Sequence, residues 1–225
     1  MTPFDLEQID RLLLTTRAVR KRLDLERPVE SEPVLDCLRI ALQAPTGLNA
    51  QDWRWIVIRD AEKRRAIGDC FARAGDSYFA GVLEAARESG DARQVRVYES
   101  ILYLANHLGE VPVLVIPCMK RLPGDASDAL ASSHYGSIYP AVWSFQLALH
   151  SRGLGSTLTT LHLIFEQECA KLLQIPDGFT QVCLLPVAHI KGGDLRQAPR
   201  RPLEEVMSWD GWDPRWPNTL PDQTS

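Results

Sequence analysis

The chain has 225 residues and a net charge of −4, and its 45% hydrophobic and 24% charged residues are typical of a globular protein with a sizeable core. The acidic balance offers no basic surface for nucleic acid or an anionic membrane, and no apolar run is long enough to cross a bilayer. Since the N-terminus lacks the basic and apolar regions of a signal peptide, we expect one cytoplasmic domain over residues 1–225.

The placement of cysteine and histidine argues against a disulfide framework and against a metal site. The cysteines are odd in number, lie in apolar stretches and are never spaced as Cys-x-x-Cys. The histidines show no His-x-x-x-His spacing, so each is interpreted as a core or surface residue. We therefore expect no metal.

The first part of the chain predicts two helices and a strand. Residues 3–16 carry a helical apolar stripe, with Thr2 as a potential N-cap and Pro3 at the first helical position. A second stripe follows Ser31, which we expect to cap that helix. Residues 54–58 are β-branched and aromatic, which is typical of a strand.

The middle of the chain predicts a polar helical segment and then a strand. Residues 61–110 have helical periodicity with breaks expected near Gly75 and Gly90, and we interpret them as an excursion that could form a lid over a pocket. Residues 111–118 are apolar with prolines near both ends, which predicts a strand with limited edge pairing.

The second half predicts a buried helix over residues 135–151, because its residues are apolar nearly all round, and Gly153 ends it. A short helix over 166–173 and a strand over 181–189 follow. The tail, residues 208–225, is too aromatic for a solvated segment but cannot form its own core. We expect this arm to pack on a partner subunit through its tryptophans, Trp209, Trp212 and Trp216.

The most informative stretch is Ala44–Trp55, between the second helix and the first strand. Pro45 ends the helix, and Gly47 can take backbone angles closed to other residues. Asn49 and Gln51 carry amides that both donate and accept hydrogen bonds. Such a bend can place polar groups against a flat heterocycle, whereas the plain alternative is an ordinary connecting loop.

Three further segments fit the same kind of ligand. Arg17 and Arg20 could place forked cations on a phosphate or another electron-rich group. Residues 152–160 form a small polar loop, and Arg200 with Arg201 makes a second basic pair before a short helical turn. Taken singly, these segments also fit solvated turns and a helix C-cap that runs into a strand.

No catalytic constellation is evident in the sequence. It has no recognisable Ser-His-Asp, Cys-His or paired-carboxylate arrangement, and no Gly-x-Gly-x-x-Gly or Gly-x-x-x-x-Gly-Lys phosphate loop. Separated basic clusters and polar loops instead suit a protein whose cofactor carries the chemistry while the protein supplies binding and electrostatics.

Four segments in order resemble the FMN-dependent nitroreductase family over nearly the whole chain. Thr16–Arg20 resembles the family's Arg-Arg-Ser-Val-Arg, and Ala44–Trp55 resembles its Ala-Pro-Ser-Gly-Gly-Asn-x-Gln-Pro-Trp. Residues 153–159 are similar to its Gly-Leu-Gly-Ser loop, and Arg200–Val206 to its Arg-Arg-Pro-Leu-Glu-Glu-Val segment. The chain departs from the family pattern at Thr16, Ala18 and Asp52.

The resemblance implies an α+β, nitroreductase-like fold: a central, mostly antiparallel sheet flanked by helices, in an intertwined homodimer. Two FMN sites would lie at the dimer interface, with the C-terminal arm crossing to the partner. The implied activity is that of an oxidoreductase in which NADPH or NADH reduces FMN by hydride transfer. The reduced flavin would then reduce a small-molecule acceptor such as a nitroaromatic or a quinone.

The resemblance also assigns roles to residues. Arg17 and one or both of Arg200 and Arg201 would hold the FMN phosphate and ribityl chain, and Arg20 would lie at the N1/C2 edge of the ring and stabilise the reduced flavin. Pro45, Thr46 and Asn49 of the 45–51 bend would line the ring from the partner subunit, and residues 156–159 would pack on its other side. The cofactor-binding candidates are Arg17, Ala18, Val19, Arg20, Pro45, Thr46, Gly47, Asn49, Gln51, Ser156, Thr157, Leu158, Thr159, Arg200 and Arg201.

Several alternatives stay open. Ala18 lacks the hydroxyl of the family's serine, which removes a hydrogen bond of about 0.5–1.5 kcal/mol and weakens the expected FMN affinity. A specialised reductive dehalogenase or flavin-cleaving enzyme would need the 61–110 excursion to order over its substrate. A flavin-storage protein and a structural domain with solvated basic clusters are the non-catalytic alternatives. No lid pattern like the Glu/Tyr/Lys set of iodotyrosine deiodinases is clear, although Tyr98, Glu99 and Tyr103 lie in the excursion.

Overall fold

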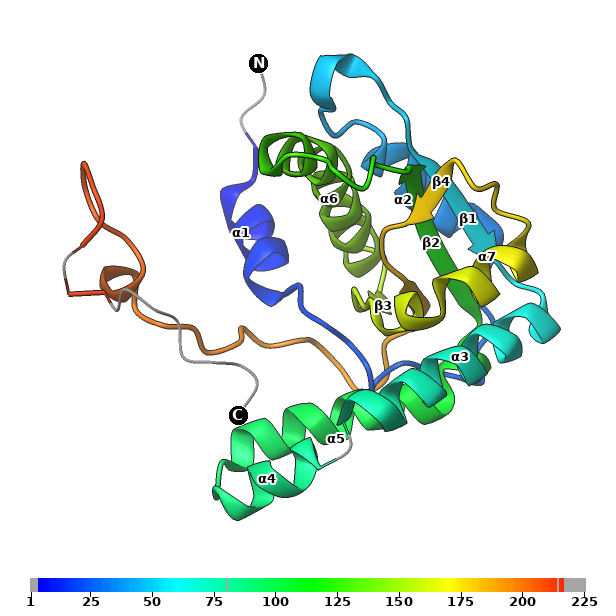
Figure 1. Cartoon of the computed structure of the whole chain (residues 1–225). Coiled ribbons are helices and arrows are strands. Elements are labelled where there is room, and N and C mark those ends of the chain that lie inside the picture. The colour runs from blue at the N-terminus through cyan, green and yellow to red at the C-terminus, as the bar shows by residue number, and fades with distance from the viewer. Residues whose placement is uncertain (1–3, 80, 214, 217–225) are drawn as a thin grey trace.

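A computed structural model describes residues 4–79, 81–213 and 215–216. The described chain folds as a sheet with helices on both faces (Figure 1). No helix in these ranges is long and apolar enough to cross a membrane. In chain order, with η for 3-10 helices, the elements are α1 Leu6–Thr15, α2 Ser31–Ala41, η1 Gly47–Asn49, β1 Arg54–Ile58, α3 Ala61–Phe79, α4 Val82–Glu88, α5 Ala92–His107, η2 Leu108–Glu110, β2 Val113–Lys120, α6 Asp128–His150, β3 Leu154–Ser156, η3 Leu161–Phe165, α7 Glu166–Leu173, β4 Phe179–Gln181, β5 Leu185–His189 and η4 Leu203–Glu205.

The sheet has the strand order β1-β2-β5-β3, and β4 also pairs with β2. Every pairing is antiparallel, which confirms the predicted α+β class with a mostly antiparallel sheet. The prediction of limited edge pairing for β2 is wrong, because β2 pairs with β1 on one side and with β4 and β5 on the other. Pro112 precedes the strand, and the carbonyl of Pro117 accepts a hydrogen bond from Val182 N at 2.9 Å.

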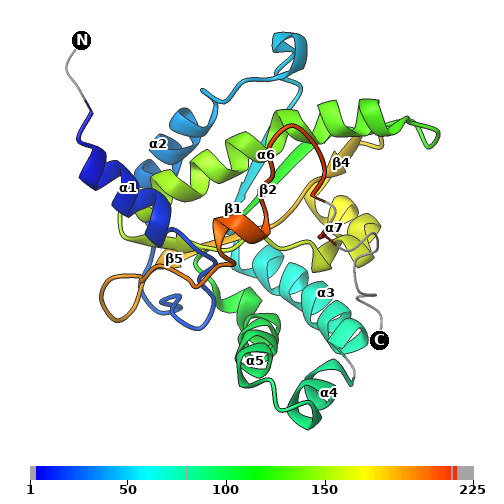
Figure 2. The same ribbon diagram turned by 90° about the vertical axis from the view of Figure 1, so that its left-hand side faces the viewer.

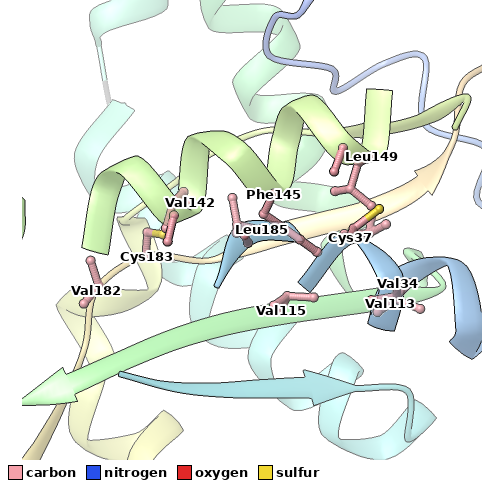
Figure 3. Close-up of a cluster of buried hydrophobic side chains, with 14 of the residues drawn as sticks. Val34, Cys37, Val113, Val115, Val142, Phe145, Leu149, Val182, Cys183 and Leu185 are labelled. Atoms are coloured by element: carbon pink, nitrogen blue, oxygen red, sulfur yellow. The ribbon is translucent and has the colours of Figure 1, made fainter. Parts of the chain in front are cut away.

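Two hydrophobic cores lie on opposite faces of the sheet, because successive β2 side chains alternate between them. Val113 and Val115 belong to the core under α2 and α6, where Figure 3 shows Phe145 of α6 among the clustered side chains. Leu114 and Ile116 belong to the core formed with α3, α5 and α7. The second core is the one beside which the candidate site is built.

Two helix starts differ from the sequence prediction. α1 begins at Leu6, where the side chain of Asp5 accepts a hydrogen bond from Gln8 N at 3.2 Å and so provides the N-cap. The predicted cap Thr2 lies outside the described residues. α2 begins with Ser31 as a helical residue instead of the cap, and its hydroxyl accepts a hydrogen bond from Arg59.

α6 is longer and less buried than predicted. It begins at Asp128, because Ser127 caps it by accepting a hydrogen bond from Leu130 N at 3.3 Å. One face buries Phe145 and its neighbours, but the other face exposes an aromatic stripe spaced four residues apart. The residues of this aromatic stripe are Tyr135, Tyr139 and Trp143, with 38%, 38% and 42% of their surface exposed.

The predicted helical excursion is present as α3, α4 and α5, and α4 and α5 project from the body of the domain (Figure 1). The predicted break at Gly75 is wrong, since α3 continues through it to Phe79. A Cβ at Gly75 would lie 3.1 Å from Ala105 Cβ, so the glycine allows close packing of α3 on α5. The break at Gly90 is confirmed, with φ +73° between α4 and α5.

The last part of the chain leaves the sheet. The predicted strand over 181–189 is divided into β4 and β5. The orange-to-red stretch beyond them extends to the left of the core in Figure 1 and passes in front of it in the turned view of Figure 2. Trp209 and Trp212 are 82% and 67% exposed. Pro214 and residues 217–225 lie outside the described residues. The partner-binding role of this arm stays a prediction.

Candidate active site

Two of the predicted segments lie side by side within one chain. The backbone N–H of Val19 donates to the carbonyl of Ser156 at 2.9 Å, and both residues are buried. Gly155 permits this approach, because a Cβ at that position would lie 3.0 Å from Val19 Cγ1 and 3.0 Å from Ile190 Cγ1. The 17–20 segment is therefore seated directly on the 153–159 loop.

The sheet fixes that loop at both ends. In β3, Gly155 pairs with Ala188 of β5. Beyond β3, Thr159 and Leu184 exchange two backbone hydrogen bonds of 3.0 and 2.8 Å. Ser156 and Thr157 are buried between these anchors, so the loop is part of the rigid framework.

Arg20 is a partly buried cation in this region. Its Nη1 donates to Ser100 Oγ of α5 at 3.4 Å, and it forms no ion pair with any described residue. Burial, followed by repulsion from Arg17, lowers the pKa of Arg20. A partly desolvated guanidinium without a carboxylate costs free energy. It is therefore suited to a ligand that supplies negative charge or electron-rich acceptors.

Backbone contacts draw the second basic pair toward the same part of the molecule. Arg17 Nη1 donates to the Arg196 carbonyl at 3.3 Å. Arg93 Nη2 of α5 donates to the Pro199 carbonyl at 3.3 Å, and the exposed Arg200 and Arg201 follow immediately. The helix that contacts Arg20 thus also holds the chain just before the 200–201 pair.

The 45–51 bend lies elsewhere. Gly47 N donates to Ser137 Oγ of α6 at 3.0 Å, and in Figure 1 the bend is at the far end of the domain from α5. Within one chain the structure therefore joins the 17–20 segment to the 153–159 loop and holds the chain before the 200–201 pair at Arg196 and Pro199. It leaves Pro45, Thr46 and Asn49 apart from them.

The backbone of the bend is unusual, although not at the glycine. Leu48, Asn49 and Gln51 have φ of 53°, 53° and 49°, whereas Gly47 has no positive φ. Such residues cost on the order of 1–3 kcal/mol each and cluster at functional sites. The amide of Gln51 donates to Asn49 Oδ1 at 3.0 Å, and the Leu48 side chain is fully exposed. The predicted use of Gly47's conformational freedom is thus wrong, and its neighbours carry the strain.

A cavity of about 310 Å³ opens beside Arg20, between α3, α5 and η3. Two of the flavin-site candidates, Arg20 and Thr159, line it. Aliphatic and aromatic side chains make up most of its wall. The described lining residues are Arg20, Phe71, Tyr78, Phe79, Ile101, Leu104, Thr159, Thr160, Leu161 and Ile164.

The polar residues noted in the excursion do not line this cavity. Glu99 pairs with Lys21 at 3.6 Å and with Arg87 at 3.7 Å. Tyr103 stacks on His107 with ring centroids 4.2 Å apart, and Tyr98 packs beside Phe79 at 5.8 Å. Through these contacts Tyr98, Glu99 and Tyr103 stabilise the helical excursion and its packing on Lys21.

Two buried polar side chains add information that sequence reasoning missed. Ser156 Oγ is buried without a hydrogen-bond partner among the described residues, at the junction with the 17–20 segment. His162, which follows the loop, is fully buried, and neither ring nitrogen has a partner there. Burial lowers the pKa of His162 to about 4, so the ring is neutral at pH 7. No spacing pattern in the sequence distinguishes this histidine from the others.

Comparisons with known proteins agree on one family. The sequence model of the Nitroreductase family matches residues 13–189. An iodotyrosine deiodinase from Thermotoga neapolitana is 27% identical over 87% of this chain and 94% of its own. An iodotyrosine deiodinase structure with FMN and 3-iodo-L-tyrosine has a TM-score of 0.67 and 23% identity, covering 88% of this chain and 96% of that one. The FMN and NADPH-dependent nitroreductase NfnB from Sphigopyxis sp. strain HMH has a TM-score of 0.64 and 22% identity, covering 89% and 98%.

Proposed function

The chain belongs to the nitroreductase family, and on that premise we propose that it is an FMN-dependent oxidoreductase. In this proposal NADH or NADPH supplies the electrons, and a small electron-poor acceptor, such as a nitroaromatic or a quinone, receives them. Structures of similar fold bind FMN, which supports the choice of cofactor.

One observation carries the proposal: a partly buried Arg20 guanidinium, without a carboxylate among the described residues, beside a cavity and a loop with an unpartnered buried hydroxyl. The cation and the Ser156 hydroxyl fit a ligand with electron-rich polar edges. The cavity of about 310 Å³ beside Arg20 is within the range of about 300–1,000 Å³ that is usual for small-molecule sites, and in this proposal it holds the acceptor next to the flavin.

In the proposed site Arg17 and the 200–201 pair bind the phosphate and ribityl chain of FMN, because forked guanidinium groups match phosphate oxygens. Arg20 holds positive charge at the edge where reduction adds negative charge, which favours the reduced form. When bound, FMN supplies the two-electron chemistry. No side chain of this chain need act as a nucleophile.

We propose that the remaining half of each site comes from a second copy of the chain. The 45–51 bend is outward-facing and apart from Arg20, so it can reach a flavin only in another subunit. The exposed aromatic stripe on α6, next to the bend's anchor Ser137, offers the apolar surface for such a homodimer. The 208–225 arm would cross to the same partner.

A second candidate function is reductive dehalogenation of an aromatic molecule. The deiodinase relative covers nearly the whole chain, which favours this alternative. It would use the same FMN site, with the helical excursion as a lid over the halogenated ring. Flavin cleavage and flavin storage remain weaker alternatives within the same fold.

The test begins with the purified protein. We expect a yellow protein, or a colourless one that binds added FMN and gains thermal stability from it. Arg20→Met keeps the bulk and removes the charge, and a charged hydrogen bond of about 1.5–3 kcal/mol would change the two-electron midpoint potential by about 30–60 mV to more negative values. Arg65→Met, at an exposed position on α3, is the matched control.

Anaerobic mixing with NADH and with NADPH then separates the alternatives. Bleaching by either nucleotide, followed by reoxidation with a nitroaromatic or quinone, supports the oxidoreductase. Persistent yellow colour in excess of both nucleotides would favour storage. A protein that binds no FMN, or an Arg20→Met variant with an unchanged midpoint potential, would contradict the corresponding part of the proposal.

A further inference from the structure

The cavity beside Arg20 has a wall chemistry that bears on which acceptor it can hold. Phe79 is the centre of an aromatic cluster, with its ring 5.0 Å from Tyr78 and 5.8 Å from Tyr98 between centroids. Tyr78 and Phe79 both line the cavity, together with aliphatic residues such as Ile101 and Leu161. Such walls favour a planar aromatic ring, since ring pairs gain about 0.5–1.5 kcal/mol beyond the area they bury.

Arg20 is the one charged residue among the described residues that line the cavity. Arg20 is its cation and the two threonines are neutral, and none of the ten described lining residues is a carboxylate. Glu99 lies on α5, the helix that supplies Ile101 to the lining, and its carboxylate pairs with Lys21 and Arg87. An ammonium group placed here would lose its hydration, meet a cation and find no carboxylate in the lining, which is strongly unfavourable. A phenolate, nitro or carbonyl oxygen would instead be attracted to Arg20.

We propose that this cavity selects a planar-ring acceptor that carries a phenolate, nitro or carbonyl oxygen and no ammonium group, and that it disfavours amino-acid zwitterions. The inference rests on the proposed function for the acceptor role. The fold alone does not determine whether the acceptor carries an amino-acid group, because the same fold could bind a ring with or without one. Halophenols, nitrophenols and quinones belong to the favoured class, whereas a halogenated tyrosine does not.

Three ligands that share a ring test the selection: 2-iodophenol, 3-iodo-L-tyrosine and the desamino analogue of iodotyrosine, which keeps the ring and the carboxylate. Binding to the FMN-loaded protein is measured by calorimetry. We expect 2-iodophenol and the desamino analogue each to bind at least about tenfold more tightly than iodotyrosine, equivalent to about 1.4 kcal/mol. Equal or tighter binding of iodotyrosine would overturn the proposal.

A variant tests whether the lack of a carboxylate in the cavity causes this preference. Thr160 lines the cavity but its surface is exposed, so Thr160→Glu introduces a carboxylate without disturbing the core. We expect it to reduce the preference against iodotyrosine by about fivefold or more, whereas the isosteric Thr160→Gln leaves the preference unchanged. An unchanged preference in Thr160→Glu, with a wild-type melting temperature, would show that cavity charge does not set the selection.

The outcome can be separated from the proposed function. FMN binding is recorded first, by absorbance, and the same calorimetric titrations are repeated without FMN. Failure to bind FMN contradicts the proposed function, while the ligand preference of the cavity is still measured. A protein that binds FMN and is reduced by NADH or NADPH, but prefers iodotyrosine, contradicts the inference alone.

Discussion

The two halves of the candidate site are built in different ways. The first half, residues 17–20 with 156–159, is joined by a buried backbone hydrogen bond and fixed by the sheet. The second half, the 45–51 bend, is exposed and contains three non-glycine residues with positive φ. The first half is therefore held in place by the fold of one chain, whereas the second half carries backbone strain that we propose is used against another subunit.

The largest effect on flavin binding should come from separating the halves. Trp143→Glu places a charge in the exposed aromatic stripe of α6, where apolar burial would hold two copies together. We expect a monomer by light scattering and FMN affinity weakened by about 100-fold, which is about 2.7 kcal/mol. Val97→Glu, at a similarly exposed position on α5, is the control and should remain dimeric. A Trp143→Glu monomer with native FMN affinity would mean that the bend is not needed.

The buried histidine after the first half predicts a pH dependence. Burial lowers the pKa of His162 to about 4 from an ordinary 6.5, so the unfolded chain binds more protons between these values. The contribution of His162 to the unfolding free energy should be at its full value above about pH 6.5. It should fall by on the order of 3 kcal/mol as the pH drops to about 4, and change no further below that pH.

His162→Leu separates this contribution from that of the carboxylates. It removes two ring nitrogens that have no partner among the described residues, so the variant should keep or gain stability at acidic pH. Urea titrations of both proteins at a series of pH values measure the difference. If the two proteins lose stability in parallel between pH 6.5 and 4, His162 is not the group responsible.

A smaller effect should come from forcing the first half apart. Gly155→Ala puts a Cβ 3.0 Å from Val19 Cγ1 and from Ile190 Cγ1, which should cost about 1–3 kcal/mol and loosen the 17–20 segment. Gly136→Ala is the matched control, because a Cβ there meets nothing within 4 Å and it lies within α6. The control should gain about 0.5–1 kcal/mol from the lower entropy of the unfolded chain. Equal unfolding midpoints for the two variants would contradict the close-approach argument.

The smallest effect should come from relieving the backbone strain in the second half, the 45–51 bend. Leu48→Gly relieves a left-handed residue, so the chain should be stabilised by about 1 kcal/mol in a thermal or urea transition. FMN affinity should nevertheless decrease, because the fully exposed Leu48 is then missing from the partner's site. A variant that becomes more stable and binds FMN equally well would make the strain a local accident of the loop.

Much of the fold could be predicted because local pattern and burial agree. The strand over 54–58 and the helix over 166–173 have the predicted bounds, since β-branched alternation and a helical stripe were undisturbed by proline or glycine. The start of α6 was missed because its first turns are mostly exposed and lack the continuous apolar pattern of the buried part, and only the cap at Ser127 marks them. The centrality of β2 was missed because prolines weaken a strand locally, while its neighbours are set by distant pairings.

The candidate site was predictable in its parts but not in its assembly. The family-like segments identified Arg17, Arg20 and the 153–159 loop, and the structure brings them together. No local pattern indicates that Leu48 and Asn49 take left-handed angles, because these follow from the anchoring of the bend on α6. The unpartnered nitrogens of His162 likewise depend on three-dimensional burial. The separation of the 45–51 bend from Arg20 within one chain was expected from the family resemblance and from no local pattern in the sequence.

The distance between the exposed bend and Arg20 has a consequence for handling the protein. If each flavin is gripped by two chains, dissociation of the subunits and release of the pigment are one equilibrium, and mass action governs both. The yellow colour should then persist in concentrated stocks and fade on extensive dilution, and added FMN should draw separated subunits back together.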